Sequence, residues 1–181
     1  GGLVGWNDCD ISYSYSSAIV SGGSDVGGLS GDSIGTIRYS YATGNVSGIN
    51  SVGGLVGHND SMVSNSYSTG NVSGDGSCTG GLVGENHGTI SNTYATGVVS
   101  GDFQVGGLVG ENGLDDPDGD IEGTVSSSYA SGTVTGNVGS SFIGGLVGFN
   151  QDTGFIFNAY ATSNVSGPTW IGGLVGGNDG I

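Results

Sequence analysis

Residues 80–101, GGLVGENHGTISNTYATGVVSG, place a few large apolar side chains among glycines and hydroxyls, too few to enclose a core of their own. Variants of the opening GGLVGEN recur along the whole chain, starting at residues 1, 27, 53, 80, 106, 144 and 172. Successive starts are 26, 26, 27, 26, 38 and 28 residues apart. A near-constant period in this range is typical of a solenoid, in which each unit buries its apolar face against the next.

The composition of the 181-residue chain agrees with a stacked array better than with a globule, because only 34% of its residues are hydrophobic. Its 42 glycines come with only two prolines, which excludes collagen. Sixteen acidic residues and a single Lys or Arg give a formal charge of −15, so we expect no nucleic acid partner. No apolar run is long enough for membrane insertion. Acidity without lysine also suggests a halophilic source.

A single repeat reads GGLVGxN, a polar corner, I-x-x-S-Y-A-T-G-N-V-S-G, and a loop that ends in valine. Short runs of β-formers between Gly, Asn and Ser indicate short strands joined by tight turns. Three short strands in about 26 residues fit one coil of a parallel β-helix. We therefore predict an all-β solenoid of six full coils plus a final strand. Its stacked leucine column would comprise Leu3, Leu29, Leu55, Leu82, Leu108, Leu146 and Leu174.

Three features of the predicted coil stay open at this stage. The glycine pair before each leucine supplies either a positive φ or a close approach of two backbones. The asparagine that ends GGLVGxN suits either a left-handed corner or an amide ladder between coils. Alternation does not decide whether the tyrosine column faces the core or the solvent, because each corner resets the parity.

The pair GGLVGxN and SYATGNVSG resembles the GLUG motif, a short repeat of bacterial and archaeal surface proteins. These include adhesin-like chains and the non-catalytic part of some IgA-cleaving peptidases. Seven copies cover almost the whole chain, although the second has Ser30 and Ser33 in place of valine and asparagine. The resemblance implies an extracellular or cell-surface location and no catalytic residue. Residues 1–181 are expected to form one array, excerpted from a longer chain because it begins and ends inside the repeat.

The longest departure from the period is an acidic loop insertion at 113–123. Its alternating carboxylates could supply about half of the six to eight oxygens that calcium takes. The match to an EF-hand loop fails, because the glycine comes one residue early and the closing glutamate is missing. The alternative is a solvated acidic loop. The candidate calcium ligands are Asp116, Asp118, Asp120 and Glu122.

The variable position of GGLVGxN forms a second candidate site. If it faces outward, Asp32, His58, Glu85 and Glu111 stand on successive coils about 5 Å apart. Retaining glycosidases use a similar carboxylate separation, which is the argument for an enzyme. A flat ridge without a cleft or basic residue argues against catalysis. We therefore interpret these four residues as a cation-binding ridge and predict that the protein is not an enzyme.

Two further residue types could carry modifications. Asn45, Asn59, Asn71 and Asn164 each begin an acceptable glycosylation sequon, although three of the four lie inside the repeat consensus. Cys9 and Cys78 lie nearly three repeats apart, which is too far for a disulfide within one solenoid. Two unpaired thiols are expected. The two histidines lack the sequence spacing typical of a zinc site.

These patterns predict a rigid structural or adhesive module, such as a spacer or stalk. Its expected partners are a second copy, through end-to-end stacking into a filament, or flanking domains of a longer chain. The alternative function is carbohydrate binding, or action on a polysaccharide, with surface glycans as partners. For that alternative, Trp6, Phe149 and Trp170 are the spare aromatic side chains.

Overall fold

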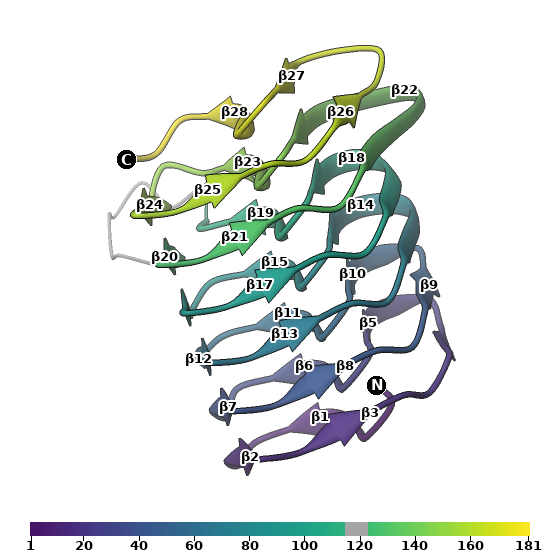
Figure 1. Ribbon diagram of the computed structural model, residues 1–181, viewed down its shortest axis with the longest axis vertical. Helices are drawn as coiled ribbons and strands as arrows, with labels where there is room; N and C mark the ends of the chain where they lie inside the picture. The colour runs from purple at the N-terminus through teal and green to yellow at the C-terminus, as the bar shows by residue number, and fades with distance from the viewer. Residues whose placement is uncertain (115–122) are drawn as a thin grey trace.

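The computed structural model describes residues 1–114 and 123–181 as an all-strand solenoid without a helix (Figure 1). The chain winds upward in Figure 1 from β1 (Val4–Asn7) to β28 (Val175–Asn178), and each turn lies directly on the one before. All strand pairs between consecutive coils are parallel, as in β11 and β15, where Val56 faces Val83. The predicted parallel β-solenoid of about six turns is confirmed. Among the described residues, no helix has the length and apolar character needed to cross a membrane.

Two sheets bring the start of each repeat together. The first sheet contains the GGLVGxN strands β1, β6 (Ser30–Ser33), β11 (Val56–Asn59), β15 (Val83–Asn86), β19 (Val109–Asn112), β23 (Val147–Asn150) and β28. The second contains β2 (Ile11–Ser12), β7 (Ile37–Arg38), β12 (Met62–Ser64), β16 (Thr89–Ser91), β20 (Thr124–Ser126) and β24 (Phe155–Phe157).

Two more sheets complete the coil. The third contains β3 (Tyr15–Ser16), β8 (Tyr41–Ala42), β13 (Tyr67–Ser68), β17 (Tyr94–Ala95), β21 (Tyr129–Ala130) and β25 (Tyr160–Ala161). The fourth contains β4 (Val20–Ser21), β5 (Ser24–Gly27), β9 (Val46–Gly48), β10 (Asn50–Gly53), β14 (Val72–Gly80), β18 (Val99–Gly106), β22 (Val134–Gly144), β26 (Val165–Ser166) and β27 (Ile171–Gly172).

The coil thus has four sheets, whereas the sequence predicted three strands. The difference lies in the segment between the valine of the V-S-G stretch, such as Val72 or Val99, and the next glycine pair, which was expected to be a loop. In β14, β18 and β22 this segment continues the strand, with a register shift near Gly74 and Gly101. These residues adopt an extended conformation because the neighbouring coil presents unpaired backbone N–H and C=O groups to them.

The interior is built from columns of identical residues. Leu55, Leu82, Leu108 and Leu146 are fully buried, as are the valines beside them. Leucines in the first and last coils have only one neighbouring coil, so Leu3 is 49% exposed and Leu174 is 40% exposed. Burial of an apolar side chain therefore requires a coil on both sides, as expected for a solenoid.

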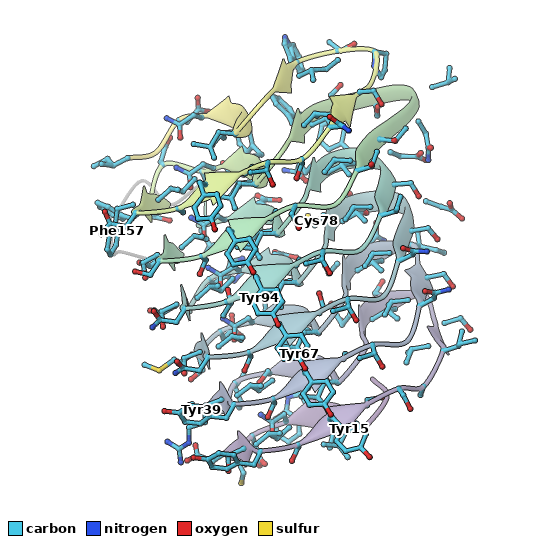
Figure 2. All side chains as sticks on the ribbon, viewed as in Figure 1. Tyr15, Tyr39, Tyr67, Cys78, Tyr94 and Phe157 are labelled. Carbon is cyan, nitrogen blue, oxygen red and sulfur yellow. The ribbon has the colours of Figure 1, made fainter. Side chains whose placement is uncertain are left out.

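The tyrosine column, one tyrosine per coil from Tyr15 to Tyr160, faces the solvent and not the core (Figure 2). Figure 2 shows the rings one above another on the outside of the third sheet. Neighbouring rings from Tyr15 to Tyr160 stack at centroid distances of 4.8–5.2 Å. The next residue in each strand points inward, and Ala42, Ala95 and Ala130 are buried. The inward position must be small because the glycine pair lies against it, and a Cβ on Gly81 would meet the Ala95 Cβ at 3.0 Å.

The glycine pairs serve close backbone approach. A Cβ on Gly80 would lie 1.8 Å from the Val83 carbonyl oxygen. Among the described residues, positive φ at glycine occurs only at Gly113, Gly123 and Gly139, outside these pairs. Residues other than glycine adopt the left-handed backbone conformation instead, at two corners per coil. One corner comprises Tyr13, Tyr39, Asn65, Asn92, Ser127 and Asn158, and the other Asp25, Ser51, Cys78, Gln104, Phe142 and Trp170.

The repeat asparagines form a buried amide ladder. Each Nδ2 donates to the Oδ1 of the next coil at 2.7–2.9 Å, through Asn59, Asn86, Asn112, Asn150 and Asn178. The same Nδ2 also donates to a carbonyl in its own corner, such as Gly88 O for Asn86. Buried amides require such partners, because an unpaired polar group costs about 1–3 kcal/mol.

The ladder is interrupted in the second coil, where serine replaces asparagine. Ser33 Oγ accepts a hydrogen bond from Asn7 Nδ2 and donates its only hydrogen to Gly35 O. Nothing in the described structure donates to Asn59 Oδ1, although that atom is buried. The sequence departure at Ser33 therefore leaves one orphaned acceptor in an otherwise paired column.

Candidate functional site

The variable position of GGLVGxN forms a column along the first sheet, which we call the ridge. Its register is as predicted, because Asp32 pairs with His58, His58 with Glu85, and Glu85 with Glu111. Each of these four side chains is half-buried rather than fully exposed. The full ridge comprises Trp6, Asp32, His58, Glu85, Glu111, Phe149 and Gly177.

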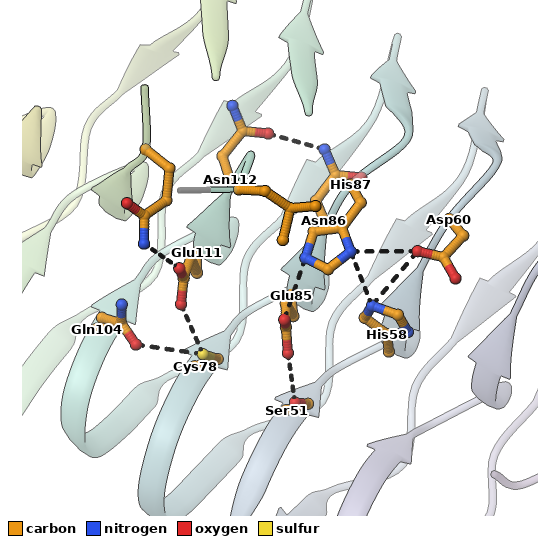
Figure 3. Close-up of polar contacts among 12 residues, drawn as sticks. Ser51, His58, Asp60, Cys78, Glu85, Asn86, His87, Gln104, Glu111 and Asn112 are labelled. Atoms are coloured by element: carbon orange, nitrogen blue, oxygen red, sulfur yellow. Dashed lines mark hydrogen bonds and ion pairs between the residues drawn. The ribbon is translucent and has the colours of Figure 1, made fainter. Parts of the chain in front are cut away.

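The ridge is half-buried because a left-handed corner packs beside it. Ser51 Oγ donates to Glu85 Oε2 at 2.8 Å, and Cys78 Sγ lies 3.1 Å from Glu111 Oε2 (Figure 3). Cys78 Sγ also contacts Gln104 Oε1 at 3.2 Å. The Glu85 and Glu111 carboxylates therefore have their own partners and do not form one open row of free acids.

Coil stacking brings the two histidines of the chain together. His58 lies on β11, and His87 lies in the corner after β15, one coil further on. His58 Nε2 is 3.1 Å from His87 Nδ1. Asp60 Oδ1 approaches both nitrogens, at 3.4 Å from His58 Nε2 and 3.2 Å from His87 Nδ1. We call His58, Asp60 and His87 the histidine cluster, and its ligand atoms all lie within 4.8 Å of one another, close enough to hold a metal ion.

The outer nitrogens of both rings face carboxylates. His58 Nδ1 lies 3.3 Å from Asp32 Oδ1, and His87 Nε2 lies 3.1 Å from Glu85 Oε1. The close approach of His87 lowers the pKa of Glu85 to about 2, and Ser51 adds to this effect, while burial opposes it. Burial lowers the pKa of His87, but Glu85 and then Asp60 outweigh it, so that this pKa is raised. The cluster is thus an electrostatically coupled unit.

Sequence reasoning did not find the histidine cluster, because it judged histidine spacing along the chain. His58 and His87 are 29 residues apart, which is one repeat plus two residues. In a solenoid, two side chains can meet when their separation lies within a few residues of the period. Applied to histidine and aspartate, that criterion would have selected these positions.

The four sequon asparagines occupy two different environments. Asn45, Asn71 and Asn164 are exposed on the outside of the coils. Asn59 is fully buried in the amide ladder, and its Nδ2 donates to Asn86 Oδ1 and Ser61 O. A glycan on Asn59 is therefore incompatible with the folded coil, which corrects the sequence interpretation at this position.

The two cysteines are unpaired, as expected, and differ in accessibility. Cys9 is exposed, whereas Cys78 is buried beside the ridge. Burial raises the pKa of the Cys78 thiol, and the charge of Glu111 raises it further.

The candidate calcium ligands Asp116, Asp118, Asp120 and Glu122 lie outside the described residues. Calcium binding by the acidic insertion therefore stays a prediction from the sequence.

The fold and these surfaces define a class: a structural repeat protein built as a parallel β-solenoid. Three consecutive stretches, residues 48–73, 75–100 and 101–135, match the family model described as the GLUG motif. Residues 48–135 therefore consist of GLUG repeats. No curated protein and no solved structure matches it.

Proposed function

We propose that the chain is a rigid, non-enzymatic spacer or adhesive stalk of an extracellular or cell-surface protein. The observation that carries the proposal is the continuous coil-to-coil register of the first sheet, which runs from Val4 paired with Ser30 to Asn150 paired with Asn178. Continuous backbone ladders and buried leucine, valine and asparagine columns resist bending, because neighbouring coils can bend apart only by exposing them. The acidic surface keeps such a rod soluble.

Three observations favour this function over the alternatives. The tyrosine rings cover one another's faces, and a sugar would need a free face to stack on. Of the three spare aromatic side chains, Trp6 lies in the first coil, far from the other two. Phe149 and Trp170 both pack against Phe142, at ring-centroid distances of 4.6 Å, so the three do not form one platform. The ridge carboxylates Glu85 and Glu111 already bond to Ser51 and Cys78. Carbohydrate binding and catalysis are therefore not proposed.

Rigidity can be tested with a pair of spin labels. One label is placed on the exposed Cys9 in the first coil and the other on a cysteine at the exposed Thr162 in the sixth, with Cys78→Ser as background. Five coil spacings separate these coils by about 24 Å along the axis. Pulsed electron resonance should give a single narrow distance distribution. A broad distribution would contradict the proposed rod.

End-to-end stacking on a second copy is part of the proposal, as is stacking on a flanking segment of the same chain. Gly173 offers a sharp test, because a Cβ there meets nothing within 4 Å, whereas a Cβ on the equivalent Gly81 would lie 2.1 Å from the next coil's carbonyl. Gly173→Ala should therefore leave the single chain folded but block the addition of another coil. Sedimentation velocity over a concentration series compares it with the wild-type chain.

Three results are informative. Assembly of the wild-type chain that Gly173→Ala abolishes supports stacking between copies. If both chains stay single rods, the result is consistent with a spacer and contradicts assembly into a filament. Equal assembly of both chains would contradict the proposed stacking surface. Calcium binding by the acidic insertion belongs to the proposal on sequence grounds, and adding calcium to the same series tests whether it promotes assembly.

A further inference from the structure

We propose that the histidine cluster is a binding site for a first-row divalent transition metal of the Zn²⁺ type. The site is independent of the proposed spacer function. Its ligand atoms would be His58 Nε2, His87 Nδ1 and Asp60 Oδ1, contributed by two consecutive coils.

The spacing of the ligand atoms fits a tetrahedral ion. Zn²⁺ binds nitrogen and oxygen at about 2.0–2.2 Å, so tetrahedral geometry separates two ligand atoms by about 3.4 Å. The three separations are 3.1 Å, 3.2 Å and 3.4 Å. An ion can therefore enter with small movements of the side chains.

The outer contacts of the rings fit a metal site as well. Histidine ligands usually direct their other ring nitrogen at a carboxylate or carbonyl, which fixes the ring and its tautomer. Here Asp32 occupies that position for His58, and Glu85 occupies it for His87. Ser51 in turn holds Glu85 at 2.8 Å (Figure 3). Both rings thus direct their inner nitrogens at Asp60 and at each other.

The local charge also calls for a cation. Asp32, Asp60 and Glu85 surround the two rings, and Arg38, the only Lys or Arg of the chain, pairs with Asp10 instead. The donor set decides which cation fits, since two imidazoles and one carboxylate suit Zn²⁺ or its neighbours, whereas calcium and magnesium prefer oxygen ligands.

The cluster is open on one side. The Asp60 side chain is 40% exposed, whereas His58 and His87 are 20% and 16% exposed. A shallow hollow of about 330 Å³ borders Asp60 and His87 and is lined further by Thr89 and Thr124. This opening gives an ion access and leaves room for water as the fourth ligand.

Calorimetric titration with Zn²⁺ tests the site, using chelator-treated protein without a histidine tag. We expect one ion per chain. Asp60→Asn should weaken binding at least tenfold, because it removes a charged ligand but keeps the side-chain shape. Asp75→Asn is the matched control, since it changes an exposed aspartate outside the cluster. His87→Ala should abolish binding, with circular dichroism verifying that the solenoid is retained.

Two further measurements distinguish binding at the histidine cluster from binding at the acidic insertion. A Co²⁺-loaded chain should show the visible absorption of tetrahedral cobalt, and Glu85→Gln should weaken Co²⁺ binding about tenfold while keeping that spectrum. Zn²⁺ affinity should be unchanged by Asp116→Asn combined with Asp118→Asn, and by excess Ca²⁺. Equal Zn²⁺ affinity of Asp60→Asn and Asp75→Asn would overturn the proposal, as would loss of binding in the insertion variant alone.

Discussion

The uniform columns of the solenoid and the ridge beside them share the same coils but behave differently. In the asparagine ladder and the tyrosine stack, each residue meets its own copy in the next coil, as Asn86 meets Asn112. On the ridge, most neighbouring residues differ in type, and even the paired glutamates have different partners. Glu85 bonds to Ser51, whereas Glu111 contacts Cys78.

The difference shows that a repeat protein can use one set of positions for stability and another set for local chemistry that differs from coil to coil. In a column of identical residues, the same contacts recur in every coil, so its members are equivalent to one another. A column of different residues needs a separate set of partners in each coil, and local chemistry such as the histidine cluster can arise there. Four substitutions or probes test this division, from the largest expected effect to the smallest.

Replacing an interior leucine should have the largest effect. Leu82→Ala removes a fully buried side chain with coils on both sides and should lower the free energy of unfolding by about 3 kcal/mol. Leu174→Ala is the matched control. Because Leu174 is 40% exposed, its replacement should lower the free energy of unfolding by less than half as much. Urea denaturation measures both. Equal losses would show that the end coil is packed as tightly as the interior.

Breaking the amide ladder should come second. Asn86→Ala leaves Asn59 Nδ2 and Asn112 Oδ1 each short of one partner in a buried column. We expect a loss of about 2 kcal/mol. Asn178→Ala, at the exposed end of the ladder, should cost far less. If the two variants were equally stable, the ladder would contribute nothing measurable to the fold.

Completing the ladder should produce a smaller effect of opposite sign. Ser33→Asn supplies an amide that can donate to the orphaned Asn59 Oδ1 and accept from Asn7, as in the other coils. The variant should be more stable by about 1 kcal/mol. Ser33→Ala, which adds no donor, serves as the comparison and should be less stable than the wild-type chain. A loss of stability in Ser33→Asn would show that this corner differs in shape from the others.

Thiol labelling probes the ridge without changing stability. An exposed Cys9 should react with a thiol reagent in the native state, although Asp8 raises its pKa and slows the reaction. Cys78 should react only after unfolding, because it is buried and its pKa is raised. Mass spectrometry therefore should show one label before denaturation and two after it. Two labels on the native chain would indicate that the coil around Cys78 opens readily.

The sequence predicted the fold well, because in a solenoid the repeat period alone determines which residues lie above one another. The period, the leucine column and the pairing of Glu85 with Glu111 all follow once equal positions are placed on successive coils. The fourth sheet was missed because its loop residues have no strand pattern of their own. They extend only when the neighbouring coil supplies hydrogen-bond partners.

The candidate site was predicted only in part. The ridge register could be derived, but its half-buried state could not, because it depends on left-handed corners at residues such as Ser51 and Cys78. These residue types carry no signature of that conformation, and glycine would have been the expected choice. The histidine cluster combines a strand position, His58, with a corner position, His87, and so escaped a column-by-column comparison.

The amide ladder also gives the solenoid an electrical direction. From Asn59 to Asn150, every ladder amide donates one hydrogen to the amide oxygen of the next coil toward the C-terminus. The aligned dipoles add, as peptide dipoles do along a helix. A head-to-head joint would therefore set oxygen against oxygen or hydrogen against hydrogen, while a head-to-tail joint continues the series. Any partner that extends the coils has to approach with one polarity, so two-fold symmetric pairing through these coil faces is disfavoured.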